Sequence, residues 1–140
     1  MRTETPSPNL DYYIGRPEPP YDSAGQAEIG HMLDRYGIPF FYKQPVLICQ
    51  NGHRTIWRPD FILPTYNSLV IEYDSTRHGA FDAASRHTRR DSYRLNGIAA
   101  LFLEPSHLAQ PDWQQRLYDQ LEQSYHEPLA FLRDPLSRRR

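Results

Sequence analysis

The fold of this chain is decided by residues 58–74, RPDFILPTYNSLVIEYD. Within them, Phe61-Ile62-Leu63 and Leu69-Val70-Ile71 are short apolar runs, separated by a segment of turn residues, Pro64 to Ser68. Runs bounded in this way predict two short strands. A further apolar run, Val46 to Cys49, precedes them and ends in an Asn-Gly turn signal. Because the connections are short, we expect the three runs to form an antiparallel meander.

Three carboxylates lie at the ends of two of these runs. Asp60 precedes the second run, and Glu72 and Asp74 follow the third. Side chains alternate along a strand, so Glu72 and Asp74 share one face. Neighbouring carboxylates repel one another unless they are solvated, protonated or bound to a metal, and Mg²⁺ or Mn²⁺ prefers oxygen ligands. The alternative is that Asp60 ends a turn and that the other two acids face solvent on an edge strand.

A helix signal precedes these runs. Ser23-x-x-Gln26 matches a capping box, and Gly37 with Pro39 marks the end of the helix. The apolar residues at helical spacing are Ile29, Met32, Leu33 and Tyr36. Glu28 lies beside this stripe, so its carboxylate either reaches the sheet from the edge of the helix or is exposed.

Taken in order, these residues resemble the PD-(D/E)xK nuclease superfamily, most closely the branch of very-short-patch-repair-like endonucleases, from about Ser23 to Leu108. In that family a glutamate on the first helix precedes a meander that carries Pro-Asp and then Glu-x-Lys. The matching residues are Glu28, Pro59-Asp60 and residues 70–78, VIEYDSTRH, which is similar to the Glu-x-Asp-Gly-x-x-His variant. The resemblance implies an α/β fold with a restriction-endonuclease-like mixed sheet and flanking helices, in the order α-β-β-β-α-β-α. It also implies a metal-dependent endonuclease that hydrolyses phosphodiester bonds in DNA.

The resemblance implies roles for particular residues. Asp60, Glu72 and the backbone carbonyl of Tyr73 would hold a Mg²⁺ or Mn²⁺ ion. Glu28 and Asp74 would act through water or hold a second ion. Arg77 and His78, which follow Asp74 in the matched segment, are further catalytic candidates. The full set of catalytic candidates is Glu28, Asp60, Glu72, Asp74, Arg77 and His78.

The motif departs from the family at its lysine, which is replaced by Asp74, and at the glycine of the nearer branch, which is replaced by Ser75. Lys43 is the only lysine in the chain, and its position before the first apolar run gives no ground for placing it in the site. Either Asp74 changes the metal arrangement, or Arg77 or His78 supplies the missing charge, or the site is inactive. An inactive site would leave a nucleic-acid-binding or structural subunit of a larger defence or mobile-element complex.

Positive charge is segregated in this chain rather than abundant. Residues 77–94 carry five arginines and two aspartates, whereas the whole chain, with 16 basic and 17 acidic residues, has a formal charge of −1. This pattern suits a phosphate-contacting face, and the alternative is a solvated helix face. The candidate nucleic-acid contacts are Arg86, Arg89, Arg90 and Arg94, with Ala83, Ala84 and Leu95 as the apolar contacts of the helix. We expect DNA as the partner, with a protein partner or a homodimer as further options and no membrane.

The chain of 140 residues is expected to form one domain. Its predicted parts are a proline- and tyrosine-rich arm (1–22), the endonuclease-like core (23–108), a C-terminal helix packed on the core (109–133) and a basic tail (134–140).

Two further elements complete the prediction. Residues 98–103 predict a central strand, and a helix is expected to open at Pro111-Asp112 with Trp113, Leu117, Leu121 and Tyr125 on one stripe. Cys49 is the only cysteine, which excludes a disulfide framework and a cysteine-based zinc site within the chain. The sequence shows neither an apolar spanning run nor a signal-peptide pattern, so a cytoplasmic location is the expectation.

Overall fold

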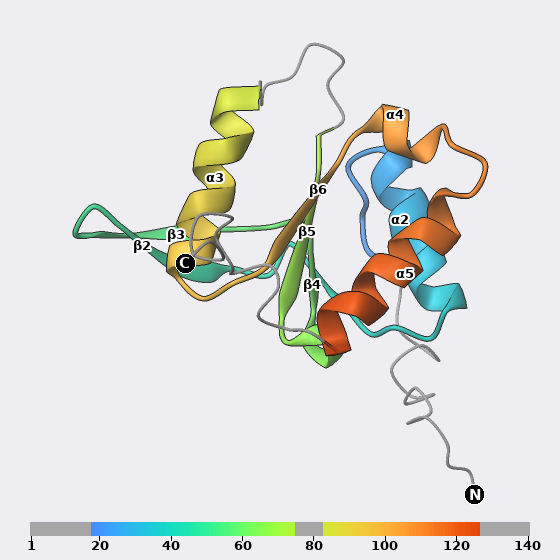
Figure 1. Cartoon of the computed structure of the whole chain (residues 1–140), viewed down its shortest axis with the longest axis horizontal. Helices are drawn as coiled ribbons and strands as arrows, with labels where there is room; N and C mark the ends of the chain where they lie inside the picture. Colours follow the sequence, from blue (N-terminus) through green and yellow to red (C-terminus); the bar gives the residue numbers. More distant parts are fainter. Residues whose placement is uncertain (1–17, 75–82, 127–140) are drawn as a thin grey trace, which may run out of the picture.

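The computed structural model describes residues 18–74 and 83–126, and it is built around a four-stranded mixed sheet (Figure 1). The strand order is β1-β4-β5-β6, with β4 antiparallel to β1 and to β5, and β6 parallel to β5. The strands of this sheet are β1 (Phe41–Tyr42), β4 (Phe61–Leu63), β5 (Leu69–Tyr73) and β6 (Ala100–Leu103). The strands β2 (Val46–Gln50) and β3 (His53–Trp57) form a separate two-stranded hairpin.

Helices lie on both sides of the sheet, as Figure 1 shows. The helices α2 (Ala24–Arg35) and α5 (Trp113–His126) cover one face, and α3 (Ala83–Leu95) covers the other. Two short elements, the 3₁₀ turn η1 (Pro64–Tyr66) and the helix α4 (Pro105–Leu108), connect the larger ones. The prediction of an α/β protein with a mixed sheet and flanking helices is therefore confirmed.

The predicted meander is wrong in its first strand. Residues 46–50 pair with His53–Trp57 and not with Phe61–Leu63. Asn51 and Gly52 have φ angles of 53° and 79°, and two positive φ angles in succession are what a two-residue hairpin turn requires. The sequence HRTIW lacks the apolar alternation that marks a half-buried strand, so β3 could not be recognised from its periodicity.

Two smaller expectations also need correction. The strand β6 lies at an end of the sheet rather than at its centre, since in residues 18–74 and 83–126 it pairs only with β5. Among the α3 side chains that the structure describes, those of residues 85–95, Tyr93 is the fully buried one, whereas Leu95 is 82% exposed; the side chains of Ala83 and Ala84 lie outside the described part. The Tyr93 ring packs against the strands because α3 lies directly over β2 and β6.

The helix α2 begins after Ser23 and ends before Gly37 as its sequence predicts, but the predicted capping box is only half formed, because Gln26 bonds the amide before the N-cap residue. The Ser23 side chain accepts a hydrogen bond from the Gln26 amide at 3.2 Å, while the Gln26 side chain accepts from the Asp22 amide at 2.9 Å. At the other end Gly37 has a φ of 70°, and the Ile38 amide donates to the Leu33 carbonyl at 2.8 Å. This is the closing bond of a glycine-terminated helix.

Two glycines let α2 approach its neighbours closely. A Cβ atom on Gly25 would lie 2.2 Å from Cζ of Tyr73, and one on Gly30 would lie 2.0 Å from the hydroxyl of Tyr21. The aromatic rings occupy the space that larger side chains would need. Tyr21, from the predicted N-terminal arm, thus packs on the core through α2 and the Phe61 ring.

We predict that Gly25→Ala destabilises the protein, although alanine is the better helix former by about 1 kcal/mol. The Cβ would lie within 2.4 Å of Cζ, Cε2 and the hydroxyl of the half-buried Tyr73 ring, which must shift, and such overpacking should cost about 1–3 kcal/mol. Urea unfolding of the variant measures this loss. The matched control is Gly25→Ala in a Tyr73→Ala background, where the space is open and the substitution should no longer destabilise. An equal loss in both backgrounds would contradict the close contact.

Candidate active site

Three charged residues lie in a row across neighbouring strands, one within β5 and the other two directly beside the ends of β1 and β4. Phe61 of β4 faces Tyr42 on one side and Ile71 on the other. Extending both registers by one residue gives the next row across the sheet. Its members, called the charged row below, are Lys43, Asp60 and Glu72. Of the three, Glu72 turns toward Arg89 on α3. Asp60 instead turns toward Lys43, whose φ of 59° departs from strand conformation and whose ammonium reaches Asp22 before α2.

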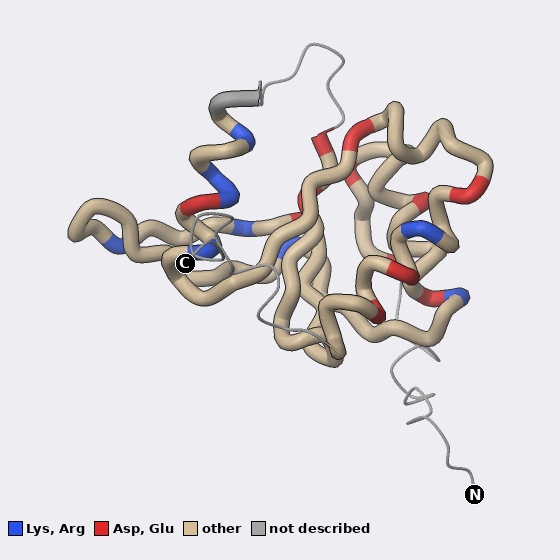
Figure 2. The backbone as a smooth tube through the Cα atoms, in the orientation of Figure 1, with Lys and Arg blue, Asp and Glu red and all other residues tan. Residues whose placement is uncertain are grey.

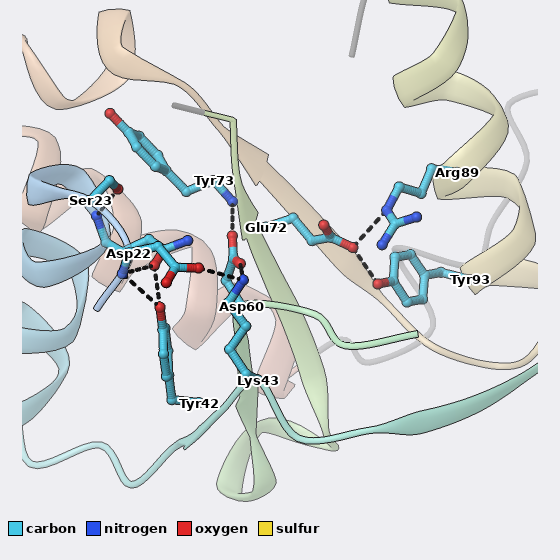
Figure 3. A network of polar contacts seen from close by, with 10 residues as sticks. Asp22, Ser23, Tyr42, Lys43, Asp60, Glu72, Tyr73, Arg89 and Tyr93 are labelled. Atoms are coloured by element: carbon cyan, nitrogen blue, oxygen red, sulfur yellow. Dashed lines mark hydrogen bonds and ion pairs between the residues drawn. The ribbon is translucent and has the colours of Figure 1, made fainter. Parts of the chain in front are cut away.

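Asp60 is buried and joins the lysine to the sheet (Figure 3). Its Oδ2 atom accepts a hydrogen bond of 2.7 Å from the Tyr73 amide, and its Oδ1 atom lies 3.4 Å from Nζ of Lys43. The Lys43 amide donates to the Asp60 carbonyl at 3.0 Å. The ammonium also lies 2.9 Å from a carboxylate oxygen of Asp22, just before α2. The Lys43 ammonium therefore lies between Asp22, just before α2, and Asp60 of the charged row.

Glu72 is equally buried but is held by α3. Its Oε2 atom accepts a hydrogen bond of 2.8 Å from Nε of Arg89 and another from the Tyr93 hydroxyl. Figure 3 shows Asp60 turned toward Lys43 and Tyr73, and Glu72 turned toward Arg89 and Tyr93. The predicted site residues thus lie side by side, but their carboxylates do not aim at one point. Within residues 18–74 and 83–126, no three His, Cys, Asp or Glu side chains form a group that could hold a metal ion.

Burial makes the charged forms of Asp60 and Glu72 less favourable than they would be in water. It raises the pKa of Asp60, and the Tyr73 amide and Lys43 lower that pKa only in part. Burial likewise raises the pKa of Glu72 against the lowering effects of Arg89 and Tyr93, and the charge of Asp60 raises it further. Buried acids with raised pKa values and a nearby charge partner are common in functional sites, although structural ion pairs produce them too.

Asp74 follows on β5 and is also buried. Its Oδ2 atom lies 3.8 Å from Nη2 of Arg86, the same distance that separates Nη2 from Oε1 of Glu104. Because Glu72 and Asp74 are both buried, the alternative that they face solvent on an edge strand is wrong.

The predicted arginine face is largely engaged within the protein. Arg86 and Arg89 face the buried acids, and Arg94 lies 3.0 Å from Asp91. The guanidinium of Arg90 lies over the Phe102 ring, 5.1 Å from its centroid. The helical spacing of these arginines is as predicted, but three of the four already neutralise carboxylates.

The structure does not bring Glu28 to the charged row. Glu28 is exposed on α2, the helix that covers the other face of the sheet. Its charge adds to the effect of burial in raising the pKa of Tyr73, whose ring packs on that face. Arg77 and His78, the other catalytic candidates, lie outside the described residues.

Lys43 is the site residue that sequence reasoning missed. Its position beside Asp60 depends on β1, a strand of only two residues. Such a strand has no periodicity to detect. The available signal is the aromatic run Phe40-Phe41-Tyr42 directly before the only lysine in the chain.

Comparisons with family models, curated proteins and solved structures gave no match for this chain. The resemblance to PD-(D/E)xK nucleases therefore rests on the ordered motif residues alone. Of the helices in the described ranges, none has the length and apolarity needed to cross a bilayer.

We predict that Asp60→Asn changes how stability depends on pH. A carboxyl whose pKa is raised on folding binds protons more tightly in the native state, so its contribution to stability falls as pH rises. The fall begins near the ordinary pKa of 3.8 and is complete above the raised native value. The variant should lose this fall, while its amide oxygen can still accept from the Tyr73 amide.

Urea unfolding from about pH 4 to about pH 8 measures the difference. The control is Asp119→Asn, on the exposed side of α5, which should follow the wild-type curve. A wild-type slope in Asp60→Asn would show that Asp60 does not carry the raised pKa.

Proposed function

We propose that this chain is a metal-dependent endonuclease that hydrolyses phosphodiester bonds in DNA. The observation that carries the proposal is the charged row, in which Lys43 directly after β1, the buried Asp60 directly before β4 and the buried Glu72 within β5 are neighbours across the sheet. The motif lacks its usual lysine after Glu72, and Lys43 supplies an ammonium from the opposite side of Asp60. The row therefore contains the charge types that the resemblance requires.

The donor atoms suit a hard divalent cation. Asp60, Glu72 and the Tyr73 carbonyl offer only oxygen, which Mg²⁺ and Mn²⁺ prefer. A cation would also offset the burial cost expressed in the raised pKa values of the two acids. Sharing an ion requires Glu72 to turn away from Arg89 and Tyr93. When bound, such an ion makes a water nucleophilic near neutral pH and neutralises charge on the phosphate.

The protein's own residues would position and stabilise the substrate. Lys43 is already charged at neutral pH at the ordinary pKa of lysine, and a hydrogen bond to Asp22 is the main cause that raises this pKa further. That charge can stabilise negative charge that develops on a phosphate oxygen beside Asp60. Asp74, directly after β5, would act through water, with Arg77 or His78 as further sources of positive charge, whereas Glu28, exposed on the helix of the other face, has no part in this site.

A specific observation supports a second candidate, a nuclease-like subunit that binds nucleic acid without cutting it. Each acid of the site already has a cation nearby: Lys43 for Asp60, Arg89 for Glu72 and Arg86 for Asp74. If these pairs persist in the presence of metal, the carboxylates cannot act as ligands. Metal binding therefore separates the two candidates.

The test is nicking of supercoiled plasmid in the presence of Mg²⁺ or Mn²⁺. We expect the wild type to nick, and Asp60→Ala to be inactive because a ligand is lost. Asp119→Ala, which removes an exposed acid from α5, is the matched control and should retain activity. Nicking by Asp60→Ala at the wild-type rate would show that the activity arises elsewhere.

The same proteins can be melted with and without Mn²⁺. An ion that binds only the folded state raises the melting temperature, and a concentration about 100 times the Kd adds about 2.7 kcal/mol. The nuclease should respond and Asp60→Ala should not. A wild type that neither nicks nor responds to Mn²⁺ favours the non-cleaving subunit.

We further predict that Lys43→Met lowers the nicking rate by about 10²–10³-fold, the usual loss when one group that stabilises the transition state is removed. The Mn²⁺ response should remain, since both carboxylates remain. Lys43→Arg, which keeps the positive charge, should recover part of the rate. A Lys43→Met variant that nicks like the wild type would exclude Lys43 from the chemistry.

A further inference from the structure

The hairpin of β2 and β3 extends away from the four-stranded sheet, on the side opposite α2 and α5 (Figure 1). A two-stranded hairpin is marginally stable by itself, so its anchoring matters. Ile48 is fully buried between the hairpin and α3. The Asn96 side chain accepts from the Cys49 amide at 3.0 Å and donates to the Cys49 carbonyl at 3.1 Å. The side-chain amide of Asn96 thus bonds the outward backbone groups of Cys49, as a neighbouring strand would, and holds the hairpin against the end of α3.

The outer face of this hairpin is apolar and basic. Leu47 and Ile56 face each other in the register and are 52% and 55% exposed. The neighbouring pair on this face is Cys49 with Arg54, and both are exposed. Along β3 the alternation places Arg54 and Ile56 on one side, and continuing it one step past the strand adds Arg58. The result is an apolar pair flanked by two arginines.

The charge of the hairpin is available to a partner. Residues 44–59 contain Arg54, Arg58 and His53 but no acid. Both arginines are exposed, and in the parts of the chain that the structure describes neither forms an ion pair, unlike Arg86, Arg89 and Arg94 on α3. The hairpin carries Arg54 and no acid, and α3 carries four arginines and one acid, whereas α2 and α5 each carry two acids and one arginine (Figure 2).

The base of the hairpin lies beside the charged row. Trp57, the last residue of β3, packs its ring on the Arg89 guanidinium, 4.1 Å from the ring centroid. Arg89 in turn holds Glu72. Trp57 alternates with Ile56, so its contact with Arg89 lies on the inner face of the hairpin, toward α3, and fixes the base of the hairpin rather than its outer face.

We propose that the β2–β3 hairpin is the DNA-docking element of this chain and that it enters the major groove of a B-form duplex. The inference rests on the proposed function, because it names the substrate of the same site. The B-DNA major groove admits a two-stranded ribbon, whereas the A-form major groove of RNA is too deep and narrow. Arg54 and Arg58 contact phosphates, and Leu47 and Ile56 suit the thymine methyl groups in the groove.

A second copy of the chain is the other occupant to weigh for this face. A symmetric contact through the hairpin would bring two sets of Arg54 and Arg58 together, with no acid in residues 44–59 to balance them. Like charges brought into one interface oppose association. Charge complementarity therefore favours a polyanion over self-association.

The experiment measures binding of the full chain to a fluorescent DNA duplex in EDTA, which keeps cleavage out of the measurement. The test variant is Arg54→Glu with Arg58→Glu, and the matched control is Arg35→Glu with Arg116→Glu on α2 and α5. The test variant should bind at least about 10-fold more weakly, and the slope of log affinity against log salt should fall by about 0.9 for each lost phosphate contact. The control should match the wild type, and an RNA duplex of the same sequence should bind more weakly. Unchanged affinity and slope in the test variant overturn the proposal, as does a wild type that does not bind DNA.

A second variant, Leu47→Ser with Ile56→Ser, tests the apolar pair and the alternative occupant. We expect weaker DNA binding and an unchanged molar mass in solution. A dimer that this variant disrupts, with DNA affinity unchanged, overturns the proposal in favour of self-association. The outcome is separable from nuclease activity: a wild type that binds through the hairpin but does not nick refutes only the endonuclease. Wild-type binding and nicking by the arginine variant refute only the docking role.

Discussion

The Asp60 carboxylate takes the place of a backbone acceptor at the point where β4 begins. The Tyr73 amide is at the end of β5, and its partner strand has turned away by Pro59, so the carboxylate accepts the hydrogen bond instead. A buried amide without an acceptor would cost about 1–3 kcal/mol. Asp60 is therefore part of the sheet as well as of the charged row. Its buried charge in turn needs Lys43, which connects the row to the start of α2.

The two faces of the sheet have different tasks. The face toward α2 and α5 is closed by apolar side chains around Phe61 and Ile71, and the glycines of α2 allow very close packing. The face toward α3 holds Glu72 and Asp74 with the arginines beside them, while Asp60 and Lys43 lie where β4 begins, near Asp22. Burial raises the pKa of Glu72, so a carboxylate on this second face is costly to maintain. The protein can retain buried charges on one face because the apolar packing on the other face supplies stability. Buried charges and other departures from ordinary packing occur most often at functional sites.

Local signals in the sequence predict most of the fold, while long-range register determines the site. The helix α2 carries its own start and stop residues, and β4 and β5 are apolar runs bounded by turns, so both are predictable. The place of Lys43 depends on the pairing of a two-residue strand, which leaves no pattern in the sequence. The direction of Glu72 depends on how α3 docks, because Arg89 and Tyr93 reach the carboxylate only in the folded chain. Sequence thus predicts which acids are neighbours but not what each of them binds.

Arg89 links the hairpin to the charged row. Its guanidinium lies against the Trp57 ring and donates to Glu72, so one side chain contacts both the base of the hairpin and a buried acid. The position of the hairpin and the direction of the Glu72 carboxylate therefore depend on each other. In this structure the pairing turns Glu72 toward α3, whereas Asp60 is held by the Tyr73 amide and Lys43. The two carboxylates can approach one another only if Arg89 releases Glu72, because a guanidinium that donates to one carboxylate keeps that carboxylate on its own side.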